Sequence, residues 1–532
     1  MALVAAPAAR GASTEPPEPP VSETTAIEIA SEDPNAEEAK REHPDLAPSA
    51  NRADSDGDWE VGFFADDEQL VQVIVDDESG AIEESWTGEQ VVWKMARGYP
   101  GAFGRTLNAP WVWIPLCAIF VVGLFDWRRP LRIAHLDLLV IVAGFGLSHY
   151  FFNRGEIGLS VPLAYPPLLY LLGRMLWIGF RGASRFGGLR PAMPIAVLAI
   201  ATLFLIGVRV GLNVADSNVI DVGYSGVIGA DKITDLEPLY GDFPSNNVHG
   251  DTYGPFAYYA YVPFEQLLPW SGSWDELPAA HAAAIFFDLG TIGGLFLLGR
   301  QLRRRGGEGT ALGVQLAFAW TACPYTAFAL ESNSNDSLVA LLLVAALLVL
   351  SSAPARGAML ALATAAKIAP AALVPLFATY RDGEATRSLR VLAPFAGAFA
   401  AVTALVMVQT LIDPGLDEFW DRAIGNQAGR DSPFSVWGQA PSLEWLQTVV
   451  KLGAAALALL VAFVPRRRDP VVVAALGAAV LIALQLTVEH WFYLYIAWFL
   501  PFLFVALLAG TSRSPSERPA AATDVRRDRQ PA

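Results

Sequence analysis

The apolar segments of this chain constrain its fold more than any other feature. Eleven runs of about 17 to 24 residues recur along it, and each is long enough to cross a bilayer as a helix. The chain is 53% hydrophobic and 17% charged, whereas soluble domains carry about 25% charge. The sequence therefore predicts a polytopic, all-α membrane protein. The runs lie at 110–126, 134–152, 162–180, 192–213, 278–299, 310–330, 335–351, 391–412, 446–464, 470–487 and 491–509.

Short basic connections between the runs predict the orientation, because Lys and Arg stay on the cytoplasmic side. They lie at 127–132, 181–190, 300–305, 381–390, 466–468 and in the C-terminal tail. If all are inside, the C-terminus is cytoplasmic, and the first 105 residues and the segment 214–277 face the outer side of the plasma membrane. Two further apolar stretches contain proline and are then not full crossings. We expect 255–270 to lie at the outer interface and 356–379 to be a re-entrant pair of half-helices broken near Pro370. One full crossing at 356–379 is the alternative.

The region before the first run carries the excess negative charge. Residues 1–105 contain 23 acids and 7 bases, which accounts for the net charge of −16. Residues 1–55 are rich in Pro, Ala and Glu, and this composition predicts disorder. Residues 56–105 predict a small external α+β module, with strands at 59–64, 70–75 and 81–86 and a helix at 89–97. The opening residues 1–9 resemble the end of a signal sequence, and a low-complexity start accounts for them equally well.

The rest of the chain divides into four segments by hydropathy and composition. Residues 106–213 form N-terminal membrane helices, 214–277 an outer catalytic loop with interfacial helices, 278–510 a membrane helix bundle, and 511–532 a disordered cytoplasmic tail. No basic face remains to neutralise nucleic-acid phosphates, so a nucleic-acid partner is excluded. The sequence contains no Walker loop, dinucleotide fingerprint or zinc-protease motif. No metal-ligand set is visible, and a requirement for a divalent metal stays open.

Candidate site residues gather in the predicted outer loops. Asp221 lies soon after the run 192–213, where a carboxylate could serve as a general base. Arg430 is the cleaner candidate for binding a phosphate, because a guanidinium binds phosphate oxygens bidentately. Each candidate also has a purely structural role open to it, since Asp and Asn cap helices and lysines snorkel. The further candidate substrate-binding residues are Tyr224, Tyr240, His249, Asp251, Tyr253, Asn333, Asn335, Asp336, Lys367, Glu489 and His490.

Three motifs, in this order and on the predicted outer side, resemble the C-type superfamily of polyprenol-phosphate-dependent membrane glycosyltransferases. They are Asp221 with Tyr224 and the segment 235–241, the polar segment 331–336 before an apolar helix, and 363–370 around Lys367, where Ile368 replaces an expected proline. The resemblance covers roughly 190–510 and is strongest to glycosyltransferase family 87 and its actinobacterial relatives. Residues 75–82 resemble the strand-turn-strand of PepSY-type modules.

This resemblance implies a function. The chain is expected to be an inverting, mannosyltransferase-like enzyme that transfers a hexose or pentose from a polyprenyl-phosphate donor to a cell-envelope glycan or glycolipid. In the superfamily an acid in the first large outer loop deprotonates the acceptor hydroxyl, and Asp221 takes that place here. Two rivals remain open: a transporter or flippase of lipid-linked sugars, and an inactive relative whose external module senses envelope components.

Overall fold

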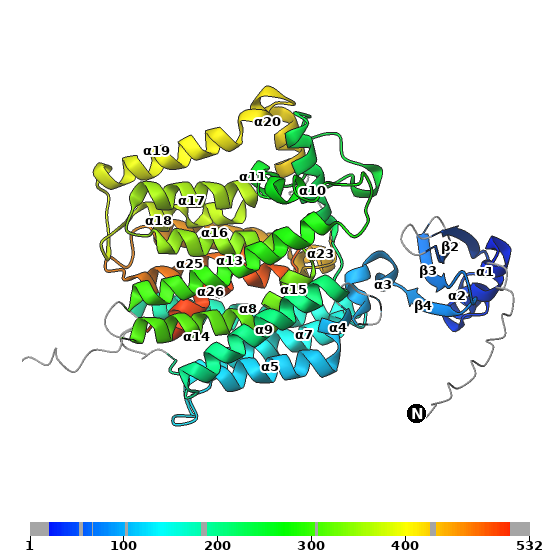
Figure 1. Cartoon of the computed structure of the whole chain (residues 1–532), viewed down its shortest axis with the longest axis horizontal. Helices are drawn as coiled ribbons and strands as arrows, with labels where there is room; N and C mark the ends of the chain where they lie inside the picture. Colours follow the sequence, from blue (N-terminus) through cyan, green and yellow to red (C-terminus); the bar gives the residue numbers. More distant parts are fainter. Residues whose placement is uncertain are drawn as a thin grey trace, which may run out of the picture. The chain divides into compact units, whose positions relative to one another are not determined.

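The computed structural model describes residues 21–52, 57–65, 68–99, 101, 105–181, 189–303, 307–425 and 432–510. These residues divide into two compact units, one up to Gly101 and one from Ala102 onward. The first is a small α+β module and the second is mostly helical (Figure 1).

The first unit is built on a four-stranded antiparallel meander in the order β1-β2-β3-β4. Its strands are β1 (Ala47–Arg52), β2 (Trp59–Ala65), β3 (Glu68–Val75) and β4 (Ile82–Thr87). The last three confirm the strands predicted from alternating apolar residues. Helices α1 (Glu23–Ser31) and α2 (Pro34–Glu42) precede the sheet, and α3 (Glu89–Val92) and a 3-10 turn, Lys94–Arg97, follow it.

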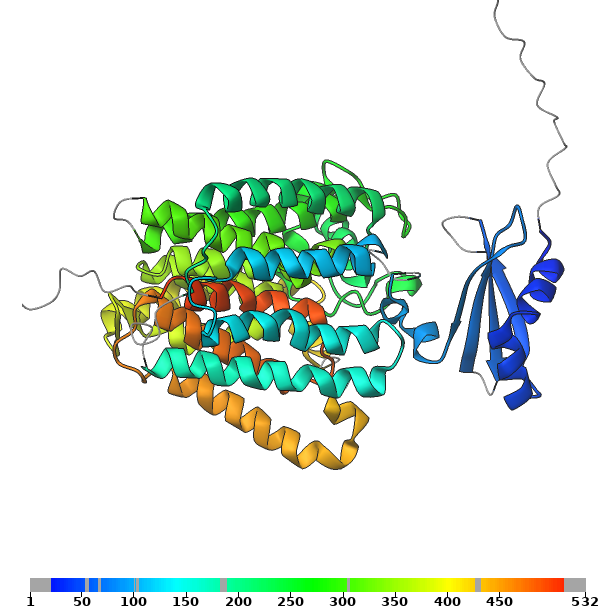
Figure 2. The same cartoon turned by 90° about the horizontal axis from the view of Figure 1, so that it is seen from below.

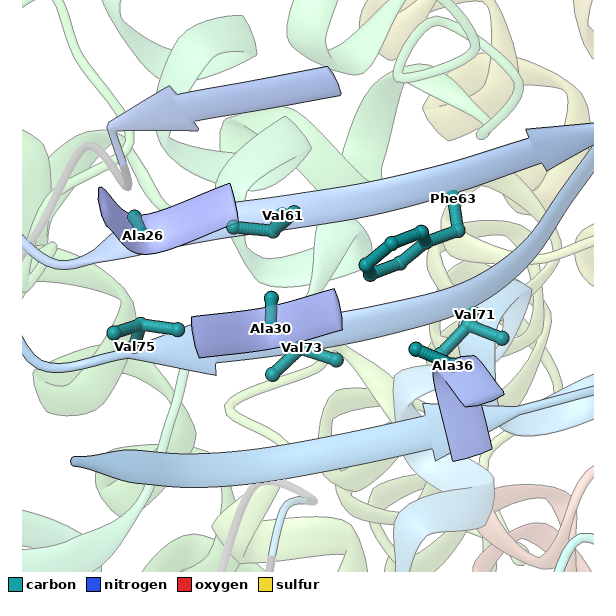
Figure 3. Close-up of a cluster of buried hydrophobic side chains, with 8 residues drawn as sticks. All are labelled: Ala26, Ala30, Ala36, Val61, Phe63, Val71, Val73 and Val75. Carbon is teal, nitrogen blue, oxygen red and sulfur yellow. The ribbon is translucent and has the colours of Figure 1, made fainter. Parts of the chain in front are cut away.

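Residues 21–52 correct the predicted disordered tail. Alanines of α1 and α2 are buried against the β2 and β3 side chains of one sheet face (Figure 3), and β1 pairs with β2. Ser22 and Asp33 cap the two helices by accepting hydrogen bonds from the backbone N–H groups of Thr25 and Asn35. The small alanine side chains let the helices approach the sheet closely. The disorder prediction used the average composition of residues 1–55, which does not show where these alanines lie. The disorder prediction is therefore wrong for 21–52, and residues 1–20 and 511–532 lie outside the described residues.

Long helices lying roughly side by side form the second unit (Figures 1 and 2). Six of its helical segments are long and apolar enough to span a membrane, by length and composition. They are Ile133–Phe152, which comprises α6 (Ile133–Leu139), a π-helical turn and α7 (Phe145–Phe152); α8 (Ile157–Arg181); α9 (Ile195–Asp216); α13 (Pro278–Leu302); α19 (Leu389–Val406); and Pro441–Leu460, which ends in α24 (Glu444–Leu460).

Shorter apolar helices complete the bundle. They are α5 (Pro110–Leu124), α14 (Glu308–Ala322), α15 (Pro324–Glu331), α16 (Asp336–Leu348), α17 (Ala353–Ala366), α18 (Val374–Ala378), α25 (Pro470–Gln485) and α26 (Ile496–Leu508). Every α26 residue is buried, whereas a window covering α19 is only 11% buried. Protein surrounds the short helices α16, α25 and α26, whereas α5 exposes large apolar side chains such as Trp111 and Ile114.

The segment 356–379 has the predicted broken, hairpin-like form. Helix α17 ends at Ala366, and a 3-10 turn, Ala369–Leu373, leads into α18, so the break falls at Lys367 and Ile368. The buried Arg356, near the start of α17, donates hydrogen bonds to the carbonyls of Phe377 at 2.8 Å and Tyr380 at 2.6 Å. Both ends of the segment therefore lie together, as a re-entrant hairpin requires, and Lys367 lies at its tip.

All the described basic connections gather at one end of the bundle. Backbone and side-chain hydrogen bonds link their neighbourhoods in a chain, so helices that leave this end return to it. The links are Ala192 to Phe125, Leu189 to Leu507, Arg303 to Leu508 and Gly510, Gln301 to Leu348, Arg356 to Leu350 and Tyr380, and Ala385 to Arg466. The start of α16, the end of α17 and the start of α26 consequently lie at the opposite end.

The segment after α9 also has the predicted form. It begins with α10 (Asp221–Thr234) and continues through the short helices α11 (Pro255–Tyr259) and α12 (Val262–Glu265). Five and four residues are too few to cross a bilayer, so 255–270 contains no crossing. Between α19 and α24 lie α20 (Val408–Ile412), α21 (Leu416–Phe419), a π-helical turn, Trp420–Gly425, and α23 (Val436–Gln439).

Candidate functional site

Helix α10 presents Asp221 at its first position. The Asp221 side chain is exposed, and the next nine residues are buried. The helix start is fixed against the polar segment before α16, because the Ile220 N–H donates to the Ser332 carbonyl at 3.2 Å. A Cβ on Gly223 would lie 2.3 Å from the Asn333 carbonyl oxygen, so glycine is required for this close contact. The fold thus holds a carboxylate at the rim of a buried polar segment.

Asp336 and Lys367 form a desolvated ion pair beside this segment. Lys367 Nζ lies 2.7 Å from Asp336 Oδ1, and the two side chains are 10% and 1% exposed. The same oxygen accepts a hydrogen bond from Trp498 Nε1 at 2.8 Å, and Ser334 Oγ donates to Oδ2 at 2.6 Å. Asp336 opens α16, Lys367 is the hairpin tip and Trp498 lies on α26, so three helix ends meet at one carboxylate.

The Tyr253 ring faces the ion pair. Its ring lies 5.7 Å from Lys367 Nζ, which also faces the rings of Tyr495 at 5.6 Å and Trp498 at 5.2 Å. Burial raises the pKa of the Tyr253 phenol well above its usual value, and the negative charges of Asp221 and Asp336 add to the effect. The phenol therefore stays neutral and can donate a hydrogen bond.

Gly254 fixes the loop that carries Tyr253. A Cβ at Gly254 would lie 2.1 Å from the Ala365 carbonyl oxygen at the end of α17. Tyr240 Oη donates to the Tyr253 carbonyl at 2.9 Å, and Tyr258 Oη donates to the Gly250 carbonyl at 2.8 Å. The loop 249–255 is thus bound on both sides, against the hairpin tip and against buried tyrosines.

Asp251 belongs to a second cluster. Its side chain is buried, and Oδ2 accepts a hydrogen bond from the Gly241 N–H at 2.8 Å and lies 3.6 Å from Arg422 Nη1. Arg422 also pairs with Glu418 at 2.9 Å. These two carboxylates raise the pKa of Arg422, Glu418 through a hydrogen bond and Asp251 through its charge. Asp251 therefore ties the loop to the segment after α20.

Several predicted residues hold the site together from buried positions. The Tyr224 ring is fully buried and stacks on Trp274, with centroids 4.7 Å apart. Asn333 has a left-handed backbone with φ of +50°, and its side chain donates to Ser217 Oγ and accepts from Asn213 Nδ2. Asn335 is buried at the N-cap of α16. His249 is exposed.

Glu489 and His490 contact a different set of side chains. Glu489 Oε1 accepts a hydrogen bond from Gln447 Nε2 at 3.2 Å and lies 3.8 Å from Lys451 Nζ. His490 Nδ1 lies 2.8 Å from Ser432 Oγ. Arg430 falls outside the described residues.

Sequence reasoning did not single out Tyr495, Trp498 or Arg422 as site residues. Tyr495 and Trp498 come more than a hundred residues after Lys367, and both lie within an apolar run that predicts only a membrane helix. Arg422 lies eight residues before Arg430 in the same predicted outer loop. Its positive charge in that loop was the one sequence feature that could have marked it as a site residue.

Among the described residues, one group of three carboxylates could share a cation: Asp58, Asp76 and Glu83, in the N-terminal module. Exposed acidic groups of this kind are common without an ion. Among the described residues, the carboxylates of the second unit's site do not form such a group.

The membrane unit, with an exposed acid on α10 and a lysine at a hairpin tip, was compared with known families. Residues 252–488 match the family model of Glycosyltransferase family 87. This part of the chain is a glycosyltransferase family 87 domain. The match begins next to Asp251 and includes the loop 252–255, Asp336, Lys367 and Arg422, while Asp221 precedes it. A comparison with curated proteins found no match. The match confirms the resemblance to glycosyltransferase family 87 over residues 252–488, which include the motifs at 331–336 and 363–370.

Proposed function

We propose that this glycosyltransferase transfers a hexose or pentose from a polyprenyl-phosphate donor to a glycan or glycolipid of the cell envelope, with Asp221 as the general base. One observation carries the proposal. The exposed Asp221 opens a helix whose first turn is fixed to the polar segment before α16, the segment that also carries the buried Asp336 paired with Lys367. An exposed carboxylate thus lies at the edge of the polar segment that begins α16, and Lys367 pairs with Asp336 of this segment and faces the Tyr253 ring.

The proposed reaction is a single displacement. Asp221 takes the proton of the acceptor hydroxyl, and the acceptor oxygen bonds to the anomeric carbon while the bond from that carbon to the lipid phosphate oxygen breaks. The polyprenyl phosphate departs with the electron pair. One base and no enzyme nucleophile give inversion at the anomeric carbon.

The leaving phosphate requires a cation. Lys367 already shares its charge with Asp336 at 2.7 Å, so a phosphate would have to compete with this carboxylate. Arg430 is therefore our first candidate for stabilising the leaving group and Lys367 the second. The aromatic rings that surround Lys367 offer surfaces on which a sugar could stack.

The orientation that we propose has the site on the outer face. The basic connections gather at the end of the bundle opposite Asp336 and Lys367, and basic loops stay in the cytoplasm. With the hairpin 353–378 entering and leaving on one side, we retain eleven crossings and a cytoplasmic C-terminus. The external module and the loop 214–277 then share the outer side.

The test is Asp221→Asn, assayed by transfer from a defined polyprenyl-phosphate sugar in membranes. An amide of the same shape cannot accept the proton, so transfer should fall by about 100-fold or more. The control is Asp235→Asn, because Asp235 is an exposed carboxylate at the other end of the same helix and should leave transfer nearly unchanged. Immunoblotting checks that each variant is inserted at the wild-type level.

Two outcomes would remove Asp221 from the mechanism: full activity in the Asp221→Asn variant, or an equal loss in both variants. Wild-type protein that transfers no sugar from any polyprenyl-phosphate donor, but still binds one, would instead favour the inactive relative. Movement of the intact lipid-linked sugar across vesicles would favour the transporter. The family 87 domain supports the enzyme over both.

A further inference from the structure

The bundle has an open cavity at its basic end, far from the proposed site. Its volume is about 520 Å³, and it lies between the end of α13, the start of α14 and the end of α16. Its lining consists of Leu297, Arg300, Gln301, Arg303, Gly309, Thr310 and Leu348. The cavity is therefore lined by two guanidiniums, one carboxamide and one hydroxyl, together with two leucine side chains.

The cavity has an excess of positive charge. Arg300 is exposed, and its guanidinium lies 5.9 Å from the centre of the Phe296 ring. Arg303 donates its hydrogen bonds to the carbonyls of Leu508 and Gly510, which are neutral acceptors. The charges that act on Arg303 are those of Glu308, which attracts it, and Arg190, which repels it. Two guanidiniums thus line the cavity, and no carboxylate is among the described residues that line it.

An apolar strip leads along α13 to this cavity. Phe286, Leu289 and Leu297 are 58%, 39% and 52% exposed, and their spacing places them on one face of the helix. Exposed apolar side chains on a membrane helix face lipid tails. Arg300 follows Leu297 by three residues, so the cationic hollow lies where the strip ends.

We propose that this cavity binds the phosphate headgroup of an anionic glycerophospholipid, with one acyl chain along the α13 strip. Guanidiniums bind phosphate oxygens through charge-assisted hydrogen bonds, and basic pockets between membrane helices at the cytoplasmic side are favourable sites for anionic headgroups. The Thr310 hydroxyl and the Gln301 side chain can supply further polar contacts. The strip explains why the ligand is a lipid and not a soluble anion.

The test uses the full chain in detergent with phosphatidylglycerol, phosphatidylcholine or inorganic phosphate added. Phosphatidylglycerol should raise the thermal unfolding temperature and stay bound in native mass spectra. Arg300→Gln should weaken this retention about five-fold, the change expected for one basic residue near an anionic lipid. Arg390→Gln is the matched control, because Arg390 is exposed at the same end and does not line the cavity.

Arg300→Lys keeps the charge and should retain most of the lipid, which guards against a folding defect in Arg300→Gln. Equal retention in Arg300→Gln and Arg390→Gln would overturn the proposal. So would equal protection by phosphatidylcholine, which carries no net charge, or protection by inorganic phosphate as strong as that by phosphatidylglycerol.

Discussion

Replacing Lys367 by Met should destabilise the chain because it strands a buried charge. Asp336 is 1% exposed and would keep only the neutral donors Trp498 Nε1 and Ser334 Oγ. Breaking a buried ion pair by removing one partner costs about 3 to 5 kcal/mol. Asp336 begins α16, where the helix dipole favours an anion by about 0.3 to 1 kcal/mol. We therefore expect Lys367→Met to lower the free energy of unfolding by about 3 kcal/mol, near the lower limit of this range.

The partner variants separate this charge effect from lost packing. Asp336→Asn leaves a lysine that still faces aromatic rings, so it should cost less than Lys367→Met. Combining the two changes should recover part of the loss, because no unpaired carboxylate remains. The free energy of unfolding is measured by denaturant titration of purified protein in detergent, followed by tryptophan fluorescence.

Arg154→Met is the control for this series. Arg154 pairs with Glu156 at 3.1 Å on the surface, with side chains 58% and 44% exposed, and exposed pairs contribute little. If Lys367→Met costs no more than Arg154→Met, or if the double variant is the sum of the single ones, the reasoning from a desolvated pair is refuted.

Two further predictions follow from the same geometry. In a variant lacking the native cysteines, Ser245→Cys and Arg467→Cys should label on opposite sides with an impermeant reagent, because their segments lie in the predicted outer loop and in a predicted cytoplasmic connection; labelling on the same side would contradict the topology. Gly254→Ala should lower both the unfolding temperature and sugar transfer, because its Cβ would lie 2.1 Å from the Ala365 carbonyl oxygen. Gly207→Ala in α9, where a Cβ meets nothing within 4 Å, is its control, and an equal effect of both would contradict the contact.

Local patterns in the sequence determined the class of fold and several of its parts. The length of the apolar runs predicted helices that could cross a bilayer, because a bilayer sets a minimum length for such a helix, and six helical segments among the described residues meet it. Alternating residues predicted β2, β3 and β4, since side chains in a strand point to opposite faces. The break near Pro370 was also predicted from a short segment, and the motifs pointed to the family that residues 252–488 match.

Only the tertiary structure decided which of these parts meet. Asp336 and Lys367 are 31 residues apart and Asp336 and Trp498 are 162 apart, and no local pattern specifies that their helix ends converge on one carboxylate. The same limit explains the error at residues 21–52. Whether Ala26 and Ala30 are buried depends on the sheet that covers them, and composition averaged over the segment contains no information about that partner. Burial is a property of packing between distant segments, so it became visible only in the folded chain.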